Sequence, residues 1–138
     1  MSSDDSTLSA PGAAPLDARA LEASLTVDDL ERSVAWYRAA LGFTVEREHE
    51  RNGRKIAVTL RAGEVRILLG QDDGARGSQR SKGEGFSLQI RIAGSVDEVA
   101  ECVRANGGEI VTEPTDTPWG ARVCRVKDPD GFRFAIST

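Results

Sequence analysis

The most constraining feature of this sequence is an internal repeat, because the second half of the chain follows the first at a spacing of 65 residues. Apolar and glycine positions correspond at this spacing, namely Leu25 with Ile90, Val27 with Ile92, Val34 with Val99, Gly42 with Gly107, and Val45 with Ile110. A unit of this size cannot bury its apolar face alone. We therefore expect two similar modules that pair with one another, either within one chain or between chains.

Each half predicts the same order of elements. An alternating strand comes first, at 22–27 and at 86–92, and an amphipathic helix that ends at a glycine follows it. In the second half, Ser95 and Glu98 have the spacing of a helix capping box. Three further strand-like runs follow in each half, at 43–50, 54–60 and 65–69, and then at 109–112, 121–126 and 132–137. The pattern predicts an α+β fold made of two tandem βαβββ modules.

Two stretches without periodicity set the domain boundaries. Residues 1–20 are small and contain proline, so we expect a disordered tail. Residues 70–85 hold five glycines and no aliphatic side chain larger than alanine, which predicts a flexible linker. The rest, 21–138, is expected to form one domain, with module one at 21–69 and module two at 86–138.

Composition excludes several classes of function. The chain has 138 residues, and no run approaches the roughly 20 apolar residues of a membrane-spanning helix. Its net charge is −4 and it has no basic run, which argues against nucleic acid as a partner. The two cysteines have neither metal-ligand spacing nor a disulfide framework. We expect a soluble, cytoplasmic protein whose one histidine, His49, is a solvated side chain among glutamates.

Two segments resemble a known superfamily. LTVDDLERSVAWYRAALGF, near the start, and TPWGARVCRVKDPDGFRFAI, at the end, are similar to the opening and closing segments of vicinal oxygen chelate proteins. That group includes glyoxalase I, extradiol dioxygenases, fosfomycin-resistance enzymes and bleomycin-resistance proteins. The resemblance covers residues 21–137 and implies a curled, partly open, eight-stranded mixed sheet with helices on its outside. Because enzymes and pure binding proteins share this fold, it leaves the function open.

The resemblance also implies where a metal would bind. In catalytic members, four side chains on the first and last strand of each module hold a divalent metal. The resemblance places these four positions at Glu22, Leu68, Ser87 and Ala135. A chelate site takes about four nitrogen or charged oxygen ligands, and only Glu22 is a strong ligand here. We therefore expect no metal and no other cofactor.

Strand alternation predicts the other residues that line the hollow of the sheet. If the apolar residues of each strand pack under the helices, the opposite face carries Ser24, Thr26, Arg66, Gln89, Arg91 and Arg133, beside the four positions above. Trp119 matches the segment that borders the ligand cleft in bleomycin-resistance-like members. Guanidinium groups bind carboxylates bidentately, so an anionic or carbonyl-rich ligand is expected. The alternative is that these arginines pair with Glu22 or with glutamates of a second copy, or face solvent.

Three functions remain open at this point. The leading hypothesis is a metal-free, homodimeric small-molecule-binding protein of the bleomycin-resistance type, which binds or sequesters its ligand. The alternative is a lyase, isomerase or dioxygenase of the same superfamily, in which Glu22 acts as a general base and arginines stabilise an enolate. The third is an interaction module that uses the tail and the linker. The acidic turn at 128–131 has the residue order of a type I turn, and we expect it to be structural.

Overall fold

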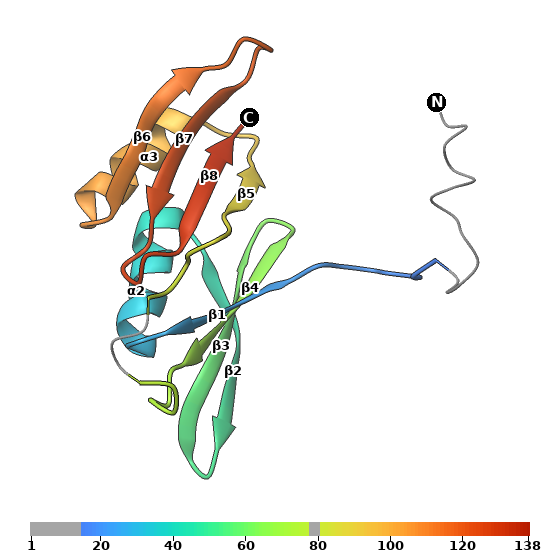
Figure 1. Ribbon diagram of the computed structural model, residues 1–138, viewed down its shortest axis with the longest axis vertical. Coiled ribbons are helices and arrows are strands. Elements are labelled where there is room, and N and C mark those ends of the chain that lie inside the picture. Colours follow the sequence, from blue (N-terminus) through green and yellow to red (C-terminus); the bar gives the residue numbers. More distant parts are fainter. Residues whose placement is uncertain (1–14, 78–80) are drawn as a thin grey trace.

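The computed structural model describes residues 15–77 and 81–138 and shows two βαβββ modules (Figure 1). Module one contains β1 (Ala23–Val27), α2 (Leu30–Leu41), β2 (Thr44–Arg51), β3 (Arg54–Ala62) and β4 (Val65–Gln71). Module two contains β5 (Leu88–Arg91), α3 (Val96–Ala105), β6 (Glu109–Asp116), β7 (Arg122–Lys127) and β8 (Arg133–Ser137). The α+β architecture of two such modules, predicted from the repeat, is confirmed.

Each module forms its own four-stranded mixed sheet. The strand orders are β1-β4-β3-β2 and β5-β8-β7-β6, so the two sheets have the same topology. In each, the first strand pairs in parallel with the last, and the other neighbours are antiparallel. The eight strands expected in one curled sheet are thus divided between two sheets. The reason is that β1 and β5 are both edge strands, and no backbone ladder joins them in the part of the chain that the structure describes.

Capping residues determine where both helices begin. The Asp29 side chain accepts a hydrogen bond from Arg32 N at 3.1 Å, and Ser95 Oγ accepts one from Glu98 N at 3.1 Å. Each bond satisfies a backbone N–H group that the helix itself leaves without a partner. These are local signals, which explains why the sequence predicted the start of α3 at Ser95.

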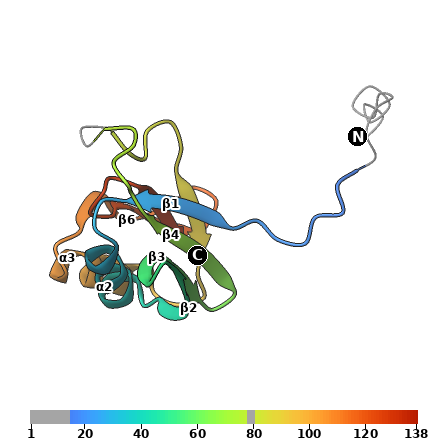
Figure 2. The same cartoon turned by 90° about the horizontal axis from the view of Figure 1, so that it is seen from below.

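The two modules pair within the chain and share one hydrophobic core. Helices α2 and α3 pack side by side on the same side of the molecule (Figure 2). Tyr37 of α2 is fully buried, and its ring contacts that of Phe134 on β8 edge to face at a centroid distance of 5.9 Å. A Cβ on Gly108 would lie 2.8 Å from the Trp36 ring, so the chain before β6 approaches α2 closely only because this residue is glycine.

The chain before β1 forms neither helix nor strand. Residues 15–22 lead away from the two modules, and the first part of the predicted tail, residues 1–14, lies outside the described residues (Figure 1). Within residues 15–77 and 81–138, no helix is long and apolar enough to span a membrane.

The described parts of the predicted linker pack against the modules, which corrects the expectation of a freely flexible segment there. β4 continues to Gln71, two residues beyond the predicted boundary, and the Lys82 side chain is only 6% exposed. A Cβ on Gly83 would lie 2.4 Å from the carbonyl oxygen of Gly131. Residues 78–80 of the linker lie outside the described residues.

Candidate functional site

The face of each sheet that points away from its helix carries most of the predicted site residues. In module one, alternate apolar residues of β1 are buried beneath α2, so Ser24 and Thr26 lie exposed on the opposite face. Leu68 of β4 lies in register between Ser24 and Thr59 of β3. We refer to the corresponding faces of the two sheets as the inner faces of modules one and two.

Arg66, predicted as a ligand-binding residue, has a partner within module one. Its Nε donates to both carboxylate oxygens of Glu46 on β2, at 2.9 and 3.0 Å. An Nη of Arg61 on β3 lies 3.9 Å from the same carboxylate. Sequence alternation did not assign Glu46 to this face, because a bulge between Val45 and Arg47 interrupts the alternation of β2. The partner of Arg66 is therefore Glu46 and not Glu22.

His49 also packs against the sheet. Its ring is half-buried, and its Nε2 lies 3.0 Å from the hydroxyl oxygen of Thr59. The expectation of a solvated histidine is wrong for this reason. A second irregularity of β2, between His49 and Glu50, explains why the sequence pattern did not predict this orientation.

The inner face of module two holds an open cavity of about 310 Å³. Ser87, Arg133 and Ala135 line it, as does Arg125 of β7, which is not among the residues predicted from the sequence. Strand alternation could have found Arg125, because its neighbours Cys124 and Val126 are both apolar and buried. Exposed side chains of Phe86 and Val111 form the apolar part of the wall.

A second cavity, of about 390 Å³, lies between the edges of the two sheets. Four of the predicted site residues line it, namely Glu22, Ser24, Arg66 and Gln89. Residues from both modules of one chain therefore meet at this cavity. Glu22 itself is exposed, and its carboxylate forms no hydrogen bond or ion pair with the described residues.

The other predicted residues lie elsewhere. Arg91 lines a third cavity of about 510 Å³, between the β3–β4 hairpin and α3, whose other walls are mostly apolar. Trp119 is 79% exposed in the turn between β6 and β7 and lines none of these three cavities, and neither does Thr26. In a single chain, Arg66, Arg91 and Arg133 thus border three different cavities. The modules pair through their helices, and this arrangement separates the side chains that one continuous curled sheet would bring together.

The four positions at which the resemblance places metal ligands do not form a chelating set. Glu22 precedes β1 and Leu68 lies on β4, whereas Ser87 precedes β5 and Ala135 lies on β8. Leucine and alanine side chains have no donor atom. Among residues 15–77 and 81–138, no three His, Cys, Asp or Glu side chains are grouped so that they could hold a metal ion. The residues present do not fit the metal of the catalytic members.

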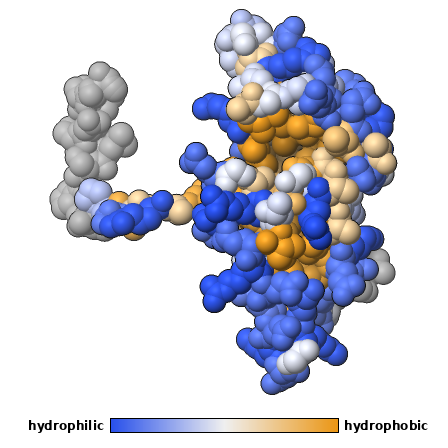
Figure 3. All heavy atoms as spheres, turned by 180° about the vertical axis from the view of Figure 1, so that it is seen from behind, coloured by the Kyte–Doolittle hydropathy of each residue, from blue (hydrophilic) through white to orange (hydrophobic). Residues whose placement is uncertain are grey.

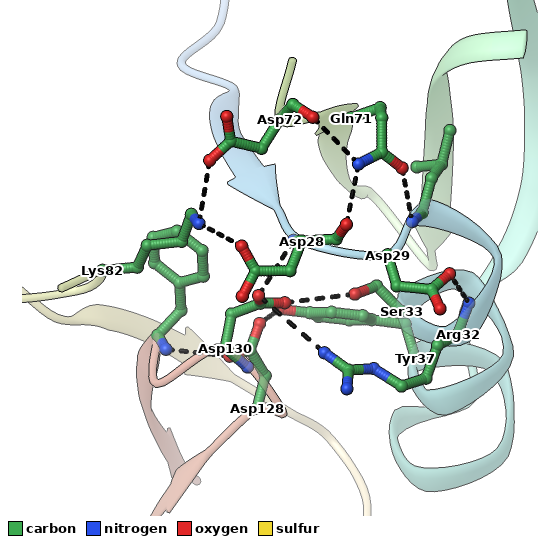
Figure 4. A network of polar contacts seen from close by, with 12 residues as sticks. Asp28, Asp29, Arg32, Ser33, Tyr37, Gln71, Asp72, Lys82, Asp128 and Asp130 are labelled. Carbon is green, nitrogen blue, oxygen red and sulfur yellow. Dashed lines mark hydrogen bonds and ion pairs between the residues drawn. The ribbon is translucent and has the colours of Figure 1, made fainter. Parts of the chain in front are cut away.

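A network of polar contacts, some of them buried, joins the two modules at the acidic turn 128–131 (Figure 4). The Tyr37 hydroxyl donates to Asp128 Oδ2 at 2.6 Å, and Asp128 Oδ1 accepts from the backbone N–H groups of Asp130 and Phe132 at 2.9 and 2.8 Å. The Ser33 hydroxyl donates to Asp130 Oδ2 at 3.2 Å. The turn therefore has contacts that fit the structural role expected of it.

The β1–α2 turn and the linker complete this network. The backbone N–H of Asp28 donates to Asp130 Oδ1 at 3.0 Å. The Lys82 ammonium forms ion pairs with the carboxylates of Asp28 and Asp72, the latter at 3.0 Å. We call the connected side chains the junction network, and they are Asp28, Ser33, Tyr37, Asp72, Lys82, Asp128 and Asp130 (Figure 4).

Burial changes the pKa values of two acids of the junction network. It raises the pKa of Asp128 and of Asp130, although hydrogen bonds from neighbouring groups oppose the shift. Burial, followed by the charge of Asp128, also raises the pKa of the Tyr37 hydroxyl. Asp28 differs, because the hydrogen bond from Lys82 lowers its pKa. Each of these groups is engaged by a contact within the chain, so the network contributes to holding the modules together.

Comparisons with known proteins agree with the fold. The family model described as "Glyoxalase/Bleomycin resistance protein/Dioxygenase superfamily" matches residues 19–136. The chain belongs to this superfamily. Its relatives there include the lactoylglutathione lyase of Salmonella typhimurium, which is 30% identical over 127 residues, or 86% of this chain and 90% of the relative. The lactoylglutathione lyase of Haemophilus influenzae is also 30% identical, over 83% of this chain and 87% of the relative.

Solved structures of the superfamily have the same fold. Glyoxalase I from Zea mays matches with a TM-score of 0.70 and 24% identity, over 86% of this chain and 44% of the maize chain. TioX from Micromonospora sp. ML1 matches with a TM-score of 0.67 and 22% identity, over 87% of this chain and 98% of that chain. At these identities, both likenesses show the fold alone.

Proposed function

We propose that this superfamily member is a metal-independent small-molecule-binding protein, which binds or sequesters an anionic or carbonyl-rich ligand on the inner faces of its sheets. The observation that carries the proposal is the pair Leu68 and Ala135. These residues lie at equivalent places in the two modules, opposite Ser24 and Gln89 respectively. Both positions carry a hydrocarbon side chain where catalytic members have a metal ligand, while the two βαβββ modules of the superfamily are retained.

The proposal includes a homodimer. Ser24, Thr26 and Gln89 are exposed in the single chain, so the inner faces are free to be covered by a second copy. Apolar residues gather in the middle of one face of the molecule, with hydrophilic residues around them and between them (Figure 3). Exposed apolar surface of this kind is typical of interaction and ligand sites. We also propose a cytoplasmic location, with neither nucleic acid nor membrane as a partner.

The second candidate is an enzyme of the superfamily with an atypical site. It is favoured by the relatives named lactoylglutathione lyase, which match most of the chain at 30% identity. Glu22 would then be the general base. Its exposed carboxylate has no positioning contact with the described residues, and a general base must be held within hydrogen-bond reach of the proton that it removes. We therefore rank this candidate second.

Metal content distinguishes the two candidates. The full chain, purified without a histidine tag, is analysed for bound metal, and its melting temperature is measured with added nickel, zinc, manganese or iron. A ligand that binds only the native state raises the melting temperature by mass action. The binding proposal predicts no bound metal and no shift. Stoichiometric metal, together with conversion of lactoylglutathione that a chelator abolishes, would overturn it.

A matched variant tests the role of Glu22. If the protein converts lactoylglutathione without metal, Glu22→Gln removes the candidate base and retains the shape of the side chain. Unchanged turnover in this variant would exclude Glu22 as the base, whereas a loss of about 100-fold or more would support the enzyme.

A further inference from the structure

Most arginines with contacts in this structure have an acidic partner. Arg104 binds Glu113 at 2.6 Å, and Arg122 lies 3.0 Å from Asp97 and 2.9 Å from Asp116. Arg66 is paired in the same way with Glu46, as described above. Their charges are therefore balanced within the chain.

Arg125 and Arg133 differ from these arginines. Neither guanidinium forms an ion pair or a side-chain hydrogen bond with any residue of 15–77 or 81–138. Both side chains are exposed, and both line the 310 Å³ cavity on the inner face of module two. Two cationic groups thus border one cavity without a counter-charge from the described residues.

The strand register brings these two arginines close together. Arg125 of β7 is paired with Ala135 of β8, and Arg133 lies two residues before Ala135 on the same face. Diagonal neighbours of this kind on adjacent strands have their Cα atoms about 7–8 Å apart. Like charges at this spacing repel one another, and an anion placed between them would relieve the repulsion.

The rest of the cavity wall favours an apolar ligand body. The side chains of Phe86 and Val111 are 48% and 50% exposed, so both leave apolar surface open at this cavity. The Phe86 ring packs against that of Phe132 at a centroid distance of 6.3 Å, so contact with the protein holds this part of the cavity wall. The volume is at the small end of ligand pockets, which run from about 300 to 1,000 Å³.

We propose that the inner face of module two binds a small organic carboxylate with an apolar body, whose carboxylate lies between Arg125 and Arg133 and whose body contacts Phe86 and Val111. Guanidinium groups recognise carboxylates bidentately, and Ser87 at the same cavity offers a hydroxyl donor. Ala135, which is paired with Arg125 across the strands, lines the same cavity without adding a charge. This inference rests on the proposed binding function and names its ligand class and its anion-binding residues.

The test is a calorimetric titration of the full-length protein with 2-naphthoate. The matched probes are 2-naphthamide and inorganic phosphate. The amide has the same shape without the charge, and phosphate has the charge without the apolar body. We expect naphthoate to bind more tightly than either probe. Arg125→Gln and Arg133→Gln should each lower the affinity for naphthoate by about 10-fold or more. Phe86→Ala should also weaken the binding of naphthoate, because it removes part of the apolar wall. Arg54→Gln, an equal change of charge at an exposed residue outside the cavity, leaves the affinity unchanged.

Three results would overturn this inference, and each is distinguishable from failure of the proposed function. Equal affinity for naphthoate and naphthamide would mean that the arginines do not select an anion, although small-molecule binding itself would stand. Phosphate binding as tightly as naphthoate would exclude a role for the apolar wall. The third result has two parts: the wild type does not bind naphthoate, and the double variant Arg125→Gln with Arg133→Gln dissociates a dimer in sedimentation experiments. It would mean that the two arginines contact a second copy of the chain and not a ligand. Failure of the proposed function would instead appear as bound metal.

Discussion

The junction network and the inner face of module two are both rich in charge, but they differ in whether the chain satisfies that charge. At the junction, Asp128 accepts three hydrogen bonds, and Lys82 is held between two carboxylates. On the inner face, Arg125 and Arg133 have no acidic partner among the described residues. Buried charges are stable only when they are paired, whereas exposed charges can remain available to a ligand.

This difference separates stability from binding. The side chains of the junction connect the β1–α2 turn, the linker and the turn 128–131, which are far apart in the sequence. Substitutions there should therefore lower the free energy of unfolding. Substitutions on the inner face of module two should change ligand affinity and leave the free energy of unfolding nearly constant.

The largest effect is expected for Asp128→Ala. This change leaves the Tyr37 hydroxyl and the N–H groups of Asp130 and Phe132 without their acceptor, and should lower the free energy of unfolding by roughly 3–5 kcal/mol. Urea denaturation followed by circular dichroism measures it. Asp116→Ala is the control, because Asp116 is an exposed partner of Arg122 and should cost less than about 1 kcal/mol. Equal losses in the two variants would contradict the comparison.

Lys82→Met should have an intermediate effect. It keeps the length of the side chain but removes the ammonium that lies between Asp28 and Asp72, and should lower the free energy of unfolding by about 1–3 kcal/mol. Lys55→Met, which removes a more exposed ion pair with Glu48, is the matched control and should cost less than about 1 kcal/mol. If both variants unfold at the same urea concentration, the linker contributes nothing to the pairing of the modules.

The acid range provides a smaller, pH-dependent test. Burial raises the pKa of Asp128 in the folded state above its value in the unfolded chain, so the folded state binds the proton more tightly. The contribution of this titration to stability is therefore present below the unfolded-state pKa and is lost as the pH rises through the folded-state pKa. The stability difference between wild type and Asp128→Asn should grow as the pH is lowered toward 4. A difference that shrinks in this range would mean that the hydrogen bonds outweigh burial.

The smallest effect on stability is expected on the inner face. Arg125→Gln and Arg133→Gln should change the free energy of unfolding by no more than about 0.5 kcal/mol, because no partner among the described residues is lost and one repulsion is relieved. Urea denaturation is again the measurement, and Arg54→Gln is the control for charge. A loss above about 1 kcal/mol would mean that these arginines are structural, and would break the distinction between the two regions.

Sequence periodicity was most informative where contacts are local. The helix start at Ser95 and the repeated order of strands were predictable, because capping and alternation depend on residues a few positions apart. Alternation failed on β2, where two irregularities turn Glu46 and His49 toward neighbouring strands. A bulge has no reliable signature in a single sequence, since it depends on how the partner strand is placed.

Residue identity alone established the repeat and the hydrocarbon side chains of Leu68 and Ala135, and with them the expectation of a site without a chelated metal. How the two modules pair was decided only in three dimensions. The contact between Tyr37 and Asp128 spans 91 residues, and the distribution of Arg66, Arg91 and Arg133 over separate cavities follows from the packing of α2 on α3. Alternation specifies which face of a strand a side chain takes, but the neighbour of that face is determined by long-range packing.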